Sequence, residues 1–382
     1  MIKVLSVIGT RPEAIKMAPV IMELQKYPED IHSIVCVTAQ HREMLDVVLN
    51  MFGIIPDNDL NLMTHNQTLP SLTSRVMMKV SQILDEIAPD ALLIQGDTTT
   101  VMTASIAAFY KKIPVGHIEA GLRTGNPYSP FPEEINRRLT SVITRFHFAP
   151  TKRAKMALLN EGISDDYIYV TGNTVIDALH RILIKPRPPS IQNMLEKIGI
   201  SQNHKKLILV TAHRRENFGE PLIKICLGLK ALVERNEDIA ILYPVHMNPN
   251  VRKPVFSILS KVKGIHLCDP LDYDVMVHMM SESYLILTDS GGIQEEAPAL
   301  GKPVLVLRTE TERPEAVKEG VAKVIGPCTK AIVKEIENLL YNQNMYNSMA
   351  RVVNCYGDGK AAIRIVNILR ENLRKNIPFK LV

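Results

Sequence analysis

Short, continuously apolar runs alternate along this sequence with longer segments of helical periodicity, and this alternation restricts the fold most strongly. Val4–Ile8, Ala91–Ile94 and Leu207–Val210 are apolar runs without the polar–apolar alternation of a strand that has one solvated face. Ala14–Leu24 and Leu222–Arg235 are examples of the helical segments. Repeated units of this kind predict an α/β protein with doubly wound parallel sheets that helices cover on both faces.

The same reading assigns elements along the whole chain of 382 residues, which is long enough for two domains. The expected strands are Val4–Ile8, Ser33–Val37, Ala91–Ile94, Val115–Ile118, His147–Ala149, Ile168–Val170, Leu207–Val210, Ile239–Pro244, Ile265–Cys268, Leu285–Thr288, Val304–Leu307 and Lys323–Ile325. The expected helices are Ala14–Leu24, Leu72–Ile87, Val101–Tyr110, Leu222–Arg235, Ala331–Leu340 and Lys360–Arg374.

The regular alternation stops between Ile184 and His204, where the proline-rich segment Lys185–Ser190 stiffens the chain. We place the domain boundary there. Residues 1–184 are expected to form an N-terminal Rossmann-like domain and residues 185–364 a C-terminal one. Two such domains facing each other enclose a central cleft, and ligands of these sheets bind beyond the carboxyl ends of the strands.

Composition excludes several classes of partner. The formal charge is only +5 and aromatic residues make up 5%, so a nucleic-acid platform is disfavoured. No run of 18 apolar residues predicts a membrane span, and the N-terminal apolar run is too short for a signal peptide. The 5 cysteines are odd in number and form no CxxC pair, which favours a cytoplasmic protein with reduced thiols.

Polar side chains gather at the ends of the expected strands in the first half. Asp97 follows Ala91–Ile94, and Glu119 follows Val115–Ile118. Each carboxylate also has a purely structural interpretation: Asp97 as a helix cap, Glu119 as the partner of Arg123, and Glu133 as a first-turn acid of a helix. Three carboxylates at neighbouring ends of one sheet favour acid–base chemistry over separate structural roles.

A second group of residues indicates anion binding. Ser290-Gly291-Gly292 lies between an apolar run and a helix, where glycines let the backbone approach a phosphate; a simple loop is the alternative. Arg11 stands at the start of a helix, which suits an anion as well as a tight turn. The sequence contains no GxxxxGK[ST], HExxH, GxSxG or GxGxxG motif, so kinase, zinc-protease, α/β-hydrolase and ordinary dehydrogenase functions are disfavoured.

Seven ordered motifs between about residue 3 and about residue 370 resemble those of the non-hydrolysing UDP-N-acetylglucosamine 2-epimerases. They are Gly9–Glu13, Gly96–Thr100, His117–Arg123, Pro132–Glu134 with Asn136 and Arg137, Thr211–Asn217, Asp289–Glu296 and Thr311–Glu315. The resemblance implies the GT-B fold, a homodimer, UDP-GlcNAc and UDP-ManNAc as ligands, and a last segment, 365–382, that crosses back onto the first domain. It implies neither a cofactor nor a metal ion.

The same resemblance implies roles for individual residues. The catalytic group is Asp97, Glu119, Glu133, His213 and Lys16. The UDP-binding group is Arg11, Lys16, His213, Ser290, Gly291, Gly292, Glu296 (on the ribose) and Arg313. Some relatives carry a second, regulatory UDP-GlcNAc site, for which Gln40, Glu43, Arg214 and His246 are the candidates; Glu43 replaces a usual glutamine, and Asn66 replaces a usual arginine.

The chemistry of the implied reaction can be argued independently. C2 of the sugar has no adjacent carbonyl, so its proton is not acidic enough for direct removal and return. Inversion therefore needs transient oxidation or elimination of UDP to a 2-acetamidoglucal, and the missing dinucleotide fingerprint favours elimination. The product would supply ManNAc for bacterial cell-surface polysaccharide. The alternatives are a hydrolysing epimerase that releases ManNAc and UDP, a GT-B glycosyltransferase, and a catalytically silent UDP-sugar sensor.

Overall fold

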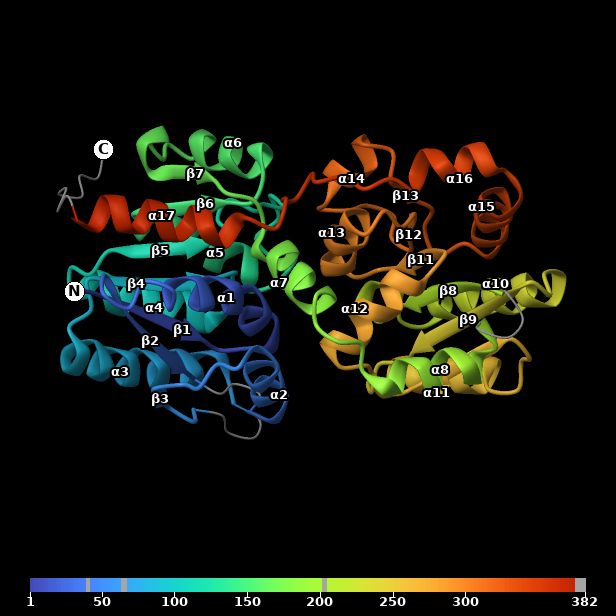
Figure 1. Cartoon of the computed structure of the whole chain (residues 1–382), viewed down its shortest axis with the longest axis horizontal. Helices are drawn as coiled ribbons and strands as arrows, with labels where there is room; N and C mark the ends of the chain where they lie inside the picture. The colour runs from blue at the N-terminus through green and yellow to red at the C-terminus, as the bar shows by residue number, and fades with distance from the viewer. Residues whose placement is uncertain (39–41, 63–66, 201–204, 375–382) are drawn as a thin grey trace. The chain divides into compact units, whose positions relative to one another are not determined.

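The computed structural model describes residues 1–38, 42–62, 67–200 and 205–374, and the side chains of Arg42, Glu43 and Met44 are excluded from the description. Close contacts divide the chain into two units (Figure 1). The first unit comprises Met1–Arg181 and the C-terminal segment that starts at Tyr356, and the second comprises Ile182–Cys355. The second unit is therefore inserted into the chain of the first.

The first unit is built on a seven-stranded, all-parallel sheet with the order β3-β2-β1-β4-β5-β6-β7. Its strands are β1 (Ile2–Ile8), β2 (Ile31–Val37), β3 (Asn58–Asp59), β4 (Ala91–Gln95), β5 (Val115–Ile118), β6 (Phe146–Ala149) and β7 (Ile168–Val170). Its helices are α1 (Arg11–Leu24), α2 (Arg42–Phe52), α3 (Leu69–Ile87), α4 (Thr99–Tyr110), α5 (Glu133–Ile143), α6 (Lys152–Asn160), α7 (Thr174–Leu183), α17 (Ala361–Arg374) and the 3-10 turn η1 (Asp165–Tyr167). The strand order reverses between β1 and β4, as in a doubly wound sheet.

Helices cover both faces of this sheet. On one face α3 packs beside α4 and α4 beside α5, and apolar side chains such as Val76 and Val80 of α3 join strand residues such as Leu92 and Ile94 in one core. On the other face α1 packs between α2 and α17 (Figure 1). The strands are almost fully buried, which explains why their sequences read as continuous apolar runs.

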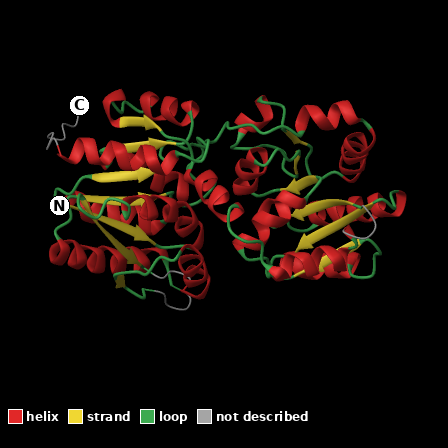
Figure 2. Ribbon diagram, in the orientation of Figure 1, coloured by secondary structure: helices red, strands yellow, loops and turns green. Residues whose placement is uncertain are grey.

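The second unit contains a six-stranded, all-parallel sheet with the order β10-β9-β8-β11-β12-β13. Its strands are β8 (Lys206–Thr211), β9 (Ile239–Pro244), β10 (Ile265–Cys268), β11 (Leu285–Thr288), β12 (Val304–Val306) and β13 (Ala322–Val324). Its helices are α8 (Pro189–Ile198), α10 (Glu220–Arg235), α11 (Pro249–Leu259), α12 (Tyr273–Glu282), α13 (Gly291–Ala299), α14 (Pro314–Lys318), α15 (Thr329–Tyr341), α16 (Gln343–Met349) and the 3-10 turn η2 (Arg215–Asn217). The yellow strands and red helices of Figure 2 alternate in both units.

The core of the second unit lies between its sheet and the helices α10, α11 and α15. Ile225 and Leu229 of α10 and Ile332 of α15 are fully buried there against strand residues such as Tyr243. The expected pair of doubly wound, parallel-sheet domains is confirmed, and this architecture is that of the GT-B fold.

The last helix is fastened to the first unit at both ends. Asp177 of α7 is buried, and its carboxylate accepts the backbone N–H groups of Ala361 (3.2 Å) and Ala362 (2.9 Å) at the start of α17. Near the other end, Arg370 donates to Asp30 at 2.5 Å. A buried carboxylate at a helix N-terminus satisfies N–H groups that the helix itself leaves unpaired. Asp177 thereby fixes the point at which the chain re-enters the first unit.

Candidate active site

Glu119 is the most constrained carboxylate of the first unit. It follows β5 with φ +66°, a left-handed conformation that is strained for a residue with a side chain. Its buried carboxylate accepts from Lys16 Nζ at 2.8 Å (Oε1) and 2.6 Å (Oε2). Arg123 instead pairs with Glu161, from Nε at 2.8 Å and Nη2 at 2.7 Å. The structural pairing of Glu119 with Arg123 is thus replaced by a pairing with Lys16.

Asp97 follows β4 and is held by residues of α5. Arg137 donates to Asp97 Oδ2 from Nε at 2.9 Å and from Nη2 at 2.7 Å, and Asn136 Nδ2 donates to the Asp97 carbonyl at 2.8 Å. The cap of α4 comes from Thr98, whose hydroxyl accepts the Val101 N–H at 3.4 Å. The Asp97 side chain therefore does not cap α4, and 29% of it is exposed.

Glu133 and Glu134 begin α5 but have different environments. Glu133 is half-buried at the first position of the helix. Glu134 is fully buried and accepts the N–H groups of Thr124 (3.0 Å) and Gly125 (3.1 Å) and a bond from Arg137 Nη1 (3.0 Å). Burial would raise the pKa of Glu134, but these donors outweigh burial and lower it. Glu134 therefore anchors Arg137 and the preceding loop, and Glu133 keeps its access to solvent.

Two buried groups, to which the sequence analysis assigned no catalytic or binding role, support the turns around this site. Glu13 of α1 accepts the Gly9 N–H at 2.6 Å and the Thr10 hydroxyl at 3.0 Å; burial raises its pKa to about 7, and the nearby charge of Asp97 adds to the increase. His117 of β5 contacts the Gly96 carbonyl through Nε2 at 2.7 Å, and burial lowers its pKa to about 3. A neutral His117 therefore donates to the peptide that precedes Asp97.

In the second unit, Asp289 organises the loop that carries His213. Asp289 is fully buried at the end of β11, and its Oδ2 accepts the N–H groups of His213 and Arg214 and Nδ2 of Asn217, each at 2.9 Å. Its Oδ1 lies 3.6 Å from His213 Nδ1. Burial lowers the pKa of His213, an effect that Asp289 opposes and that His246 and Arg214 reinforce. The His213 ring stacks on that of His246, with centroids 5.4 Å apart.

The first turn of α13 has no side-chain cap among the described hydrogen bonds. Ser290 is the N-cap residue, and Gly291 and Gly292 form the first turn. A Cβ on Gly291 would lie 3.3 Å from Glu312 Oε1 and 3.5 Å from Arg214 Nη2, so these two side chains pack close to the backbone of the turn. A helix N-terminus favours an anion, because its first N–H groups have no partner within the helix and the helix dipole is positive there.

Charged side chains surround this turn in an ordered way. Arg313 donates to the buried Glu295, and Arg308 to Glu312. Glu296, further along α13, accepts the hydroxyl of Tyr273 at 2.7 Å. Because Tyr273 and Glu296 are both buried, this bond fixes the direction of the Glu296 carboxylate.

The predicted site residues thus fall into two groups, one on each unit. Lys16 and Glu119 touch each other in the first unit, where Arg11, Asp97 and Glu133 also lie at helix starts or strand ends. The second unit contains His213, Ser290, Gly291, Gly292, Glu296, Arg313, Arg214 and His246. Gln40, Asn66 and the side chain of Glu43 lie outside the described residues. Asn173, Tyr273 and Asp289 are the further polar residues that the geometry adds.

The sequence model of the family described as UDP-N-acetylglucosamine 2-epimerase matches residues 22–370. This chain belongs to that family. The 2-epimerase of Neisseria meningitidis serogroup A is 53% identical over 371 residues, 97% of this chain and 100% of the relative. The 2-epimerase of Escherichia coli K12 is 51% identical, with 97% and 99% of the two chains covered. The resemblance found in the sequence motifs is confirmed.

Solved structures of epimerases agree with this chain over nearly its whole length. The N. meningitidis UDP-GlcNAc 2-epimerase bound to UDP-GlcNAc has a TM-score of 0.91, with 97% of this chain and 100% of the other covered. The Methanocaldococcus jannaschii UDP-GlcNAc 2-epimerase, in complex with UDP-GlcNAc and UDP, has a TM-score of 0.81 at 33% identity, with the same coverage. The epimerase architecture therefore extends through both units of this chain.

Proposed function

We propose that this chain is a non-hydrolysing UDP-GlcNAc 2-epimerase that interconverts UDP-GlcNAc and UDP-ManNAc. The observation that carries the proposal is the pair of carboxylates at the ends of the neighbouring strands β4 and β5. Asp97 is held by Arg137, and Glu119 is held by Lys16. Two carboxylates that follow neighbouring strands and pair with different cations suit a reaction that removes a proton from one face of a carbon and returns a proton to the other face.

The reaction proceeds by elimination and re-addition. The C1–O bond to UDP and the C2–H bond break, C1 and C2 form the double bond of 2-acetamidoglucal, and the proton passes to a carboxylate. UDP then attacks C1 while C2 takes a proton on its opposite face. Asp97, Glu119 and Glu133 are the acid–base carboxylates in this proposal, and Lys16 supplies positive charge beside Glu119.

The departing UDP needs positive charge and N–H donors that are already in place. We assign this role to Arg11, Lys16, His213 and Arg313 and to the turn formed by Ser290, Gly291 and Gly292. Support comes from the first turn of α13, which has two glycines and no side-chain cap among the described hydrogen bonds. Glu296 is assigned to the ribose, because Tyr273 holds its carboxylate in one direction.

Proton NMR of the purified protein with UDP-GlcNAc in D₂O, without added nicotinamide, tests the function. UDP-ManNAc with deuterium at C2 is expected, because the abstracted proton exchanges with solvent. Free ManNAc that accumulates in step with UDP would instead identify a hydrolysing epimerase. UDP binding without any turnover would identify a sensor, and product that retains protium at C2 would exclude elimination.

A homodimer is also proposed, through an apolar surface on α4 and α5 of the first unit. Ile135, Leu139 and Val142 recur along α5 at 38%, 46% and 60% exposure, and Phe109 of the adjacent helix α4 is 43% exposed. This spacing places the three α5 residues on one face of the helix. A second copy of the chain is the occupant that would bury this face.

The second UDP-GlcNAc site stays a prediction. Arg214 and His246 lie next to His213, since Arg214 follows it in the chain and His246 stacks on its ring. Binding at Gln40, Glu43, Arg214 and His246 would therefore act beside the proposed UDP site. We further propose a cytoplasmic enzyme that supplies ManNAc for cell-surface polysaccharide. All 5 cysteines are free, and among the described residues no helix is long and apolar enough to cross a membrane.

A further inference from the structure

Asn173 joins several hydrogen bonds in the loop between β7 and α7. Its side chain is 2% exposed. Nδ2 donates to Glu119 Oε1 at 3.1 Å, Oδ1 accepts the Val175 N–H at 3.1 Å in the first turn of α7, and the backbone N–H donates to the Tyr356 carbonyl at 2.6 Å. A buried amide with fixed partners on both ends cannot rotate without leaving polar groups unpaired.

The donors to Glu119 are arranged symmetrically. Oε1 receives Asn173 Nδ2, Oε2 receives Gln95 Nε2, and the Lys16 ammonium spans both oxygens. Lysine is a flexible point charge, whereas the two amides come from the sheet and its adjoining loop. The plane of the Glu119 carboxylate is therefore set by the amides rather than by the ion pair.

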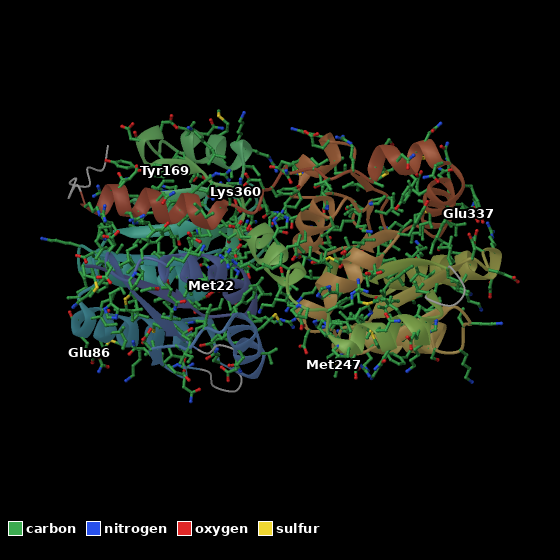
Figure 3. All side chains as sticks on the ribbon, in the orientation of Figure 1. Met22, Glu86, Tyr169, Met247, Glu337 and Lys360 are labelled. Carbon is green, nitrogen blue, oxygen red and sulfur yellow. The ribbon has the colours of Figure 1, made fainter. Side chains whose placement is uncertain are left out.

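The segment that starts at Tyr356 and returns to the first unit packs against this loop. A Cβ on Gly172 would lie 3.1 Å from Gly357 Cα, and a Cβ on Gly357 would lie 3.3 Å from the Asn173 nitrogen. Lys360, labelled in Figure 3, lies three residues after Gly357 and directly before α17. The two backbones approach this closely because both positions are glycines, so the returning segment limits where Asn173 can lie.

We propose that Asn173 is a positioning residue for the reaction. Its amide holds the Glu119 carboxylate in the orientation that proton transfer requires, and its own place is fixed by the first turn of α7 and by Tyr356. This inference rests on the proposed epimerase function and adds a residue to it. Asn173 acts through Glu119 and makes no contact with the sugar in this scheme.

The charges around Glu119 decide what a substitution at Asn173 would do. Lys16 faces the carboxylate from α1, and His117, which burial keeps neutral, lies in the preceding strand β5. Gln95 of β4 and Asn173 are uncharged. An acid in place of Asn173 would therefore place a negative charge next to the Glu119 carboxylate. Two adjoining carboxylates resist joint ionisation.

The variants Asn173→Asp and Asn173→Ser test the contact with Glu119 without removing the helix cap. Asp and Ser both retain an oxygen that can accept the Val175 N–H, and both are good N-terminal caps. Neither retains the amide donor. Asn342→Asp is the matched control, because Asn342 caps α16 by accepting the Met345 N–H at 3.0 Å in the second unit.

We expect kcat to fall about 10–100-fold in both Asn173 variants, because misplacing a reacting group costs rate rather than binding. The lower-pH limb of kcat/KM should move up by about one pH unit in Asn173→Asp but not in Asn173→Ser. UDP affinity, thermal stability and the activity of Asn342→Asp should stay near wild type.

Wild-type kcat in Asn173→Ser would overturn the inference, and so would an unchanged pH profile in Asn173→Asp. A loss of activity that follows only a loss of thermal stability would show a purely structural role and would overturn it too. A wild-type protein that fails to epimerise UDP-GlcNAc would overturn the proposed function instead, so the two failures are distinguishable.

Discussion

Arg137 donates two hydrogen bonds to a single oxygen of Asp97, from Nε at 2.9 Å and from Nη2 at 2.7 Å. Its third nitrogen, Nη1, reaches the fully buried Glu134 at 3.0 Å. Glu134 itself is held by two backbone N–H groups of the preceding loop. The loop before α5 therefore holds Glu134, Glu134 holds Arg137, and Arg137 fixes the orientation of the Asp97 carboxylate after β4.

Asp97→Asn should abolish turnover and leave UDP binding largely intact. The amide cannot accept a proton from C2, but it has nearly the shape of the carboxylate. Turnover by NMR and UDP affinity by calorimetry measure the two effects separately. Asp166→Asn, at an exposed position of η1, is the matched control. Unchanged turnover in Asp97→Asn would remove Asp97 from the mechanism.

Arg137→Lys should lower kcat about tenfold or more, because lysine cannot reproduce a planar fork that holds two carboxylates. UDP affinity should not change, since the contacts of Arg137 lie with Asp97 and Glu134. Arg138→Lys is the control: that side chain is 52% exposed and lies 3.7–3.9 Å from its acidic partners. Equal kcat in the two variants would mean that the fork is dispensable.

Acid should destabilise the first unit through its buried histidines. Burial lowers the pKa of His117 to about 3 and that of His147 to about 4, against an ordinary 6.5. The unfolded state therefore binds more protons than the folded state. The contribution of the two histidines to the free energy of unfolding is complete above about pH 6.5 and is lost as the pH falls. Each histidine contributes a slope of up to about 1.4 kcal/mol per pH unit.

Glu13 should oppose that trend, because its pKa is raised from 4.5 to about 7 by burial. Its contribution is complete below about pH 4.5 and is lost as the pH rises through 7. Glu13→Gln should gain stability relative to wild type by up to about 1.4 kcal/mol per pH unit across this window. Denaturant-dependent hydrogen exchange of β1 and β4 amides reports on this unit alone. Glu29→Gln, at an exposed position, is the matched control, and a difference for Glu13→Gln that does not change with pH would refute the assignment.

Gly121→Ala should destabilise the fold far more than Gly125→Ala. Both glycines have positive φ, +89° and +79°, but a Cβ on Gly121 would meet the Ala154 carbonyl oxygen at 2.3 Å, while none of the described atoms lies within 4 Å of one on Gly125. The backbone strain alone costs about 1 kcal/mol, and the clash adds about 1–3 kcal/mol or more. Urea unfolding of the two variants measures the difference, and equal stabilities would exclude the steric argument.

Leu139→Glu should convert the proposed dimer into monomers, because a charge at the centre of an apolar interface loses its hydration. Light scattering after gel filtration measures the mass in solution. Ile55→Glu is the control, since Ile55 is 85% exposed and lies between α2 and β3, away from this surface. A wild-type protein that is monomeric at micromolar concentration would contradict the dimer itself.

Apolar patterning predicted the strands well because burial on both faces leaves a continuous signal. Val115–Ile118, Ile239–Pro244 and Leu285–Thr288 were predicted with the bounds that the structure has. β3 was missed because two residues, Asn58 and Asp59, carry no apolar run. α1 begins at Arg11 rather than at Ala14, because a polar first turn has no hydrophobic periodicity.

The individual site residues were predictable where they follow strands, and their supports were not. Asp97 and Glu119 stand directly after apolar runs, so their place at the sheet edge follows from the pattern. Asn173 also follows an expected strand, Ile168–Val170, but its contact with Glu119 joins residues 54 positions apart and leaves no trace in the sequence pattern. The role of Asp289 likewise depends on a backbone contact with His213 that only the folded sheet creates.

The insertion of the second unit has a consequence for synthesis on the ribosome. α17 packs on α1, and Asp177 caps it, yet the 174 residues of Ile182–Cys355 are translated between Asp177 and this helix. The second unit can complete its own sheet while the nascent first unit still lacks its closing layer. The part of α1 that α17 covers therefore stays uncovered on the nascent chain until the final helix has been synthesised.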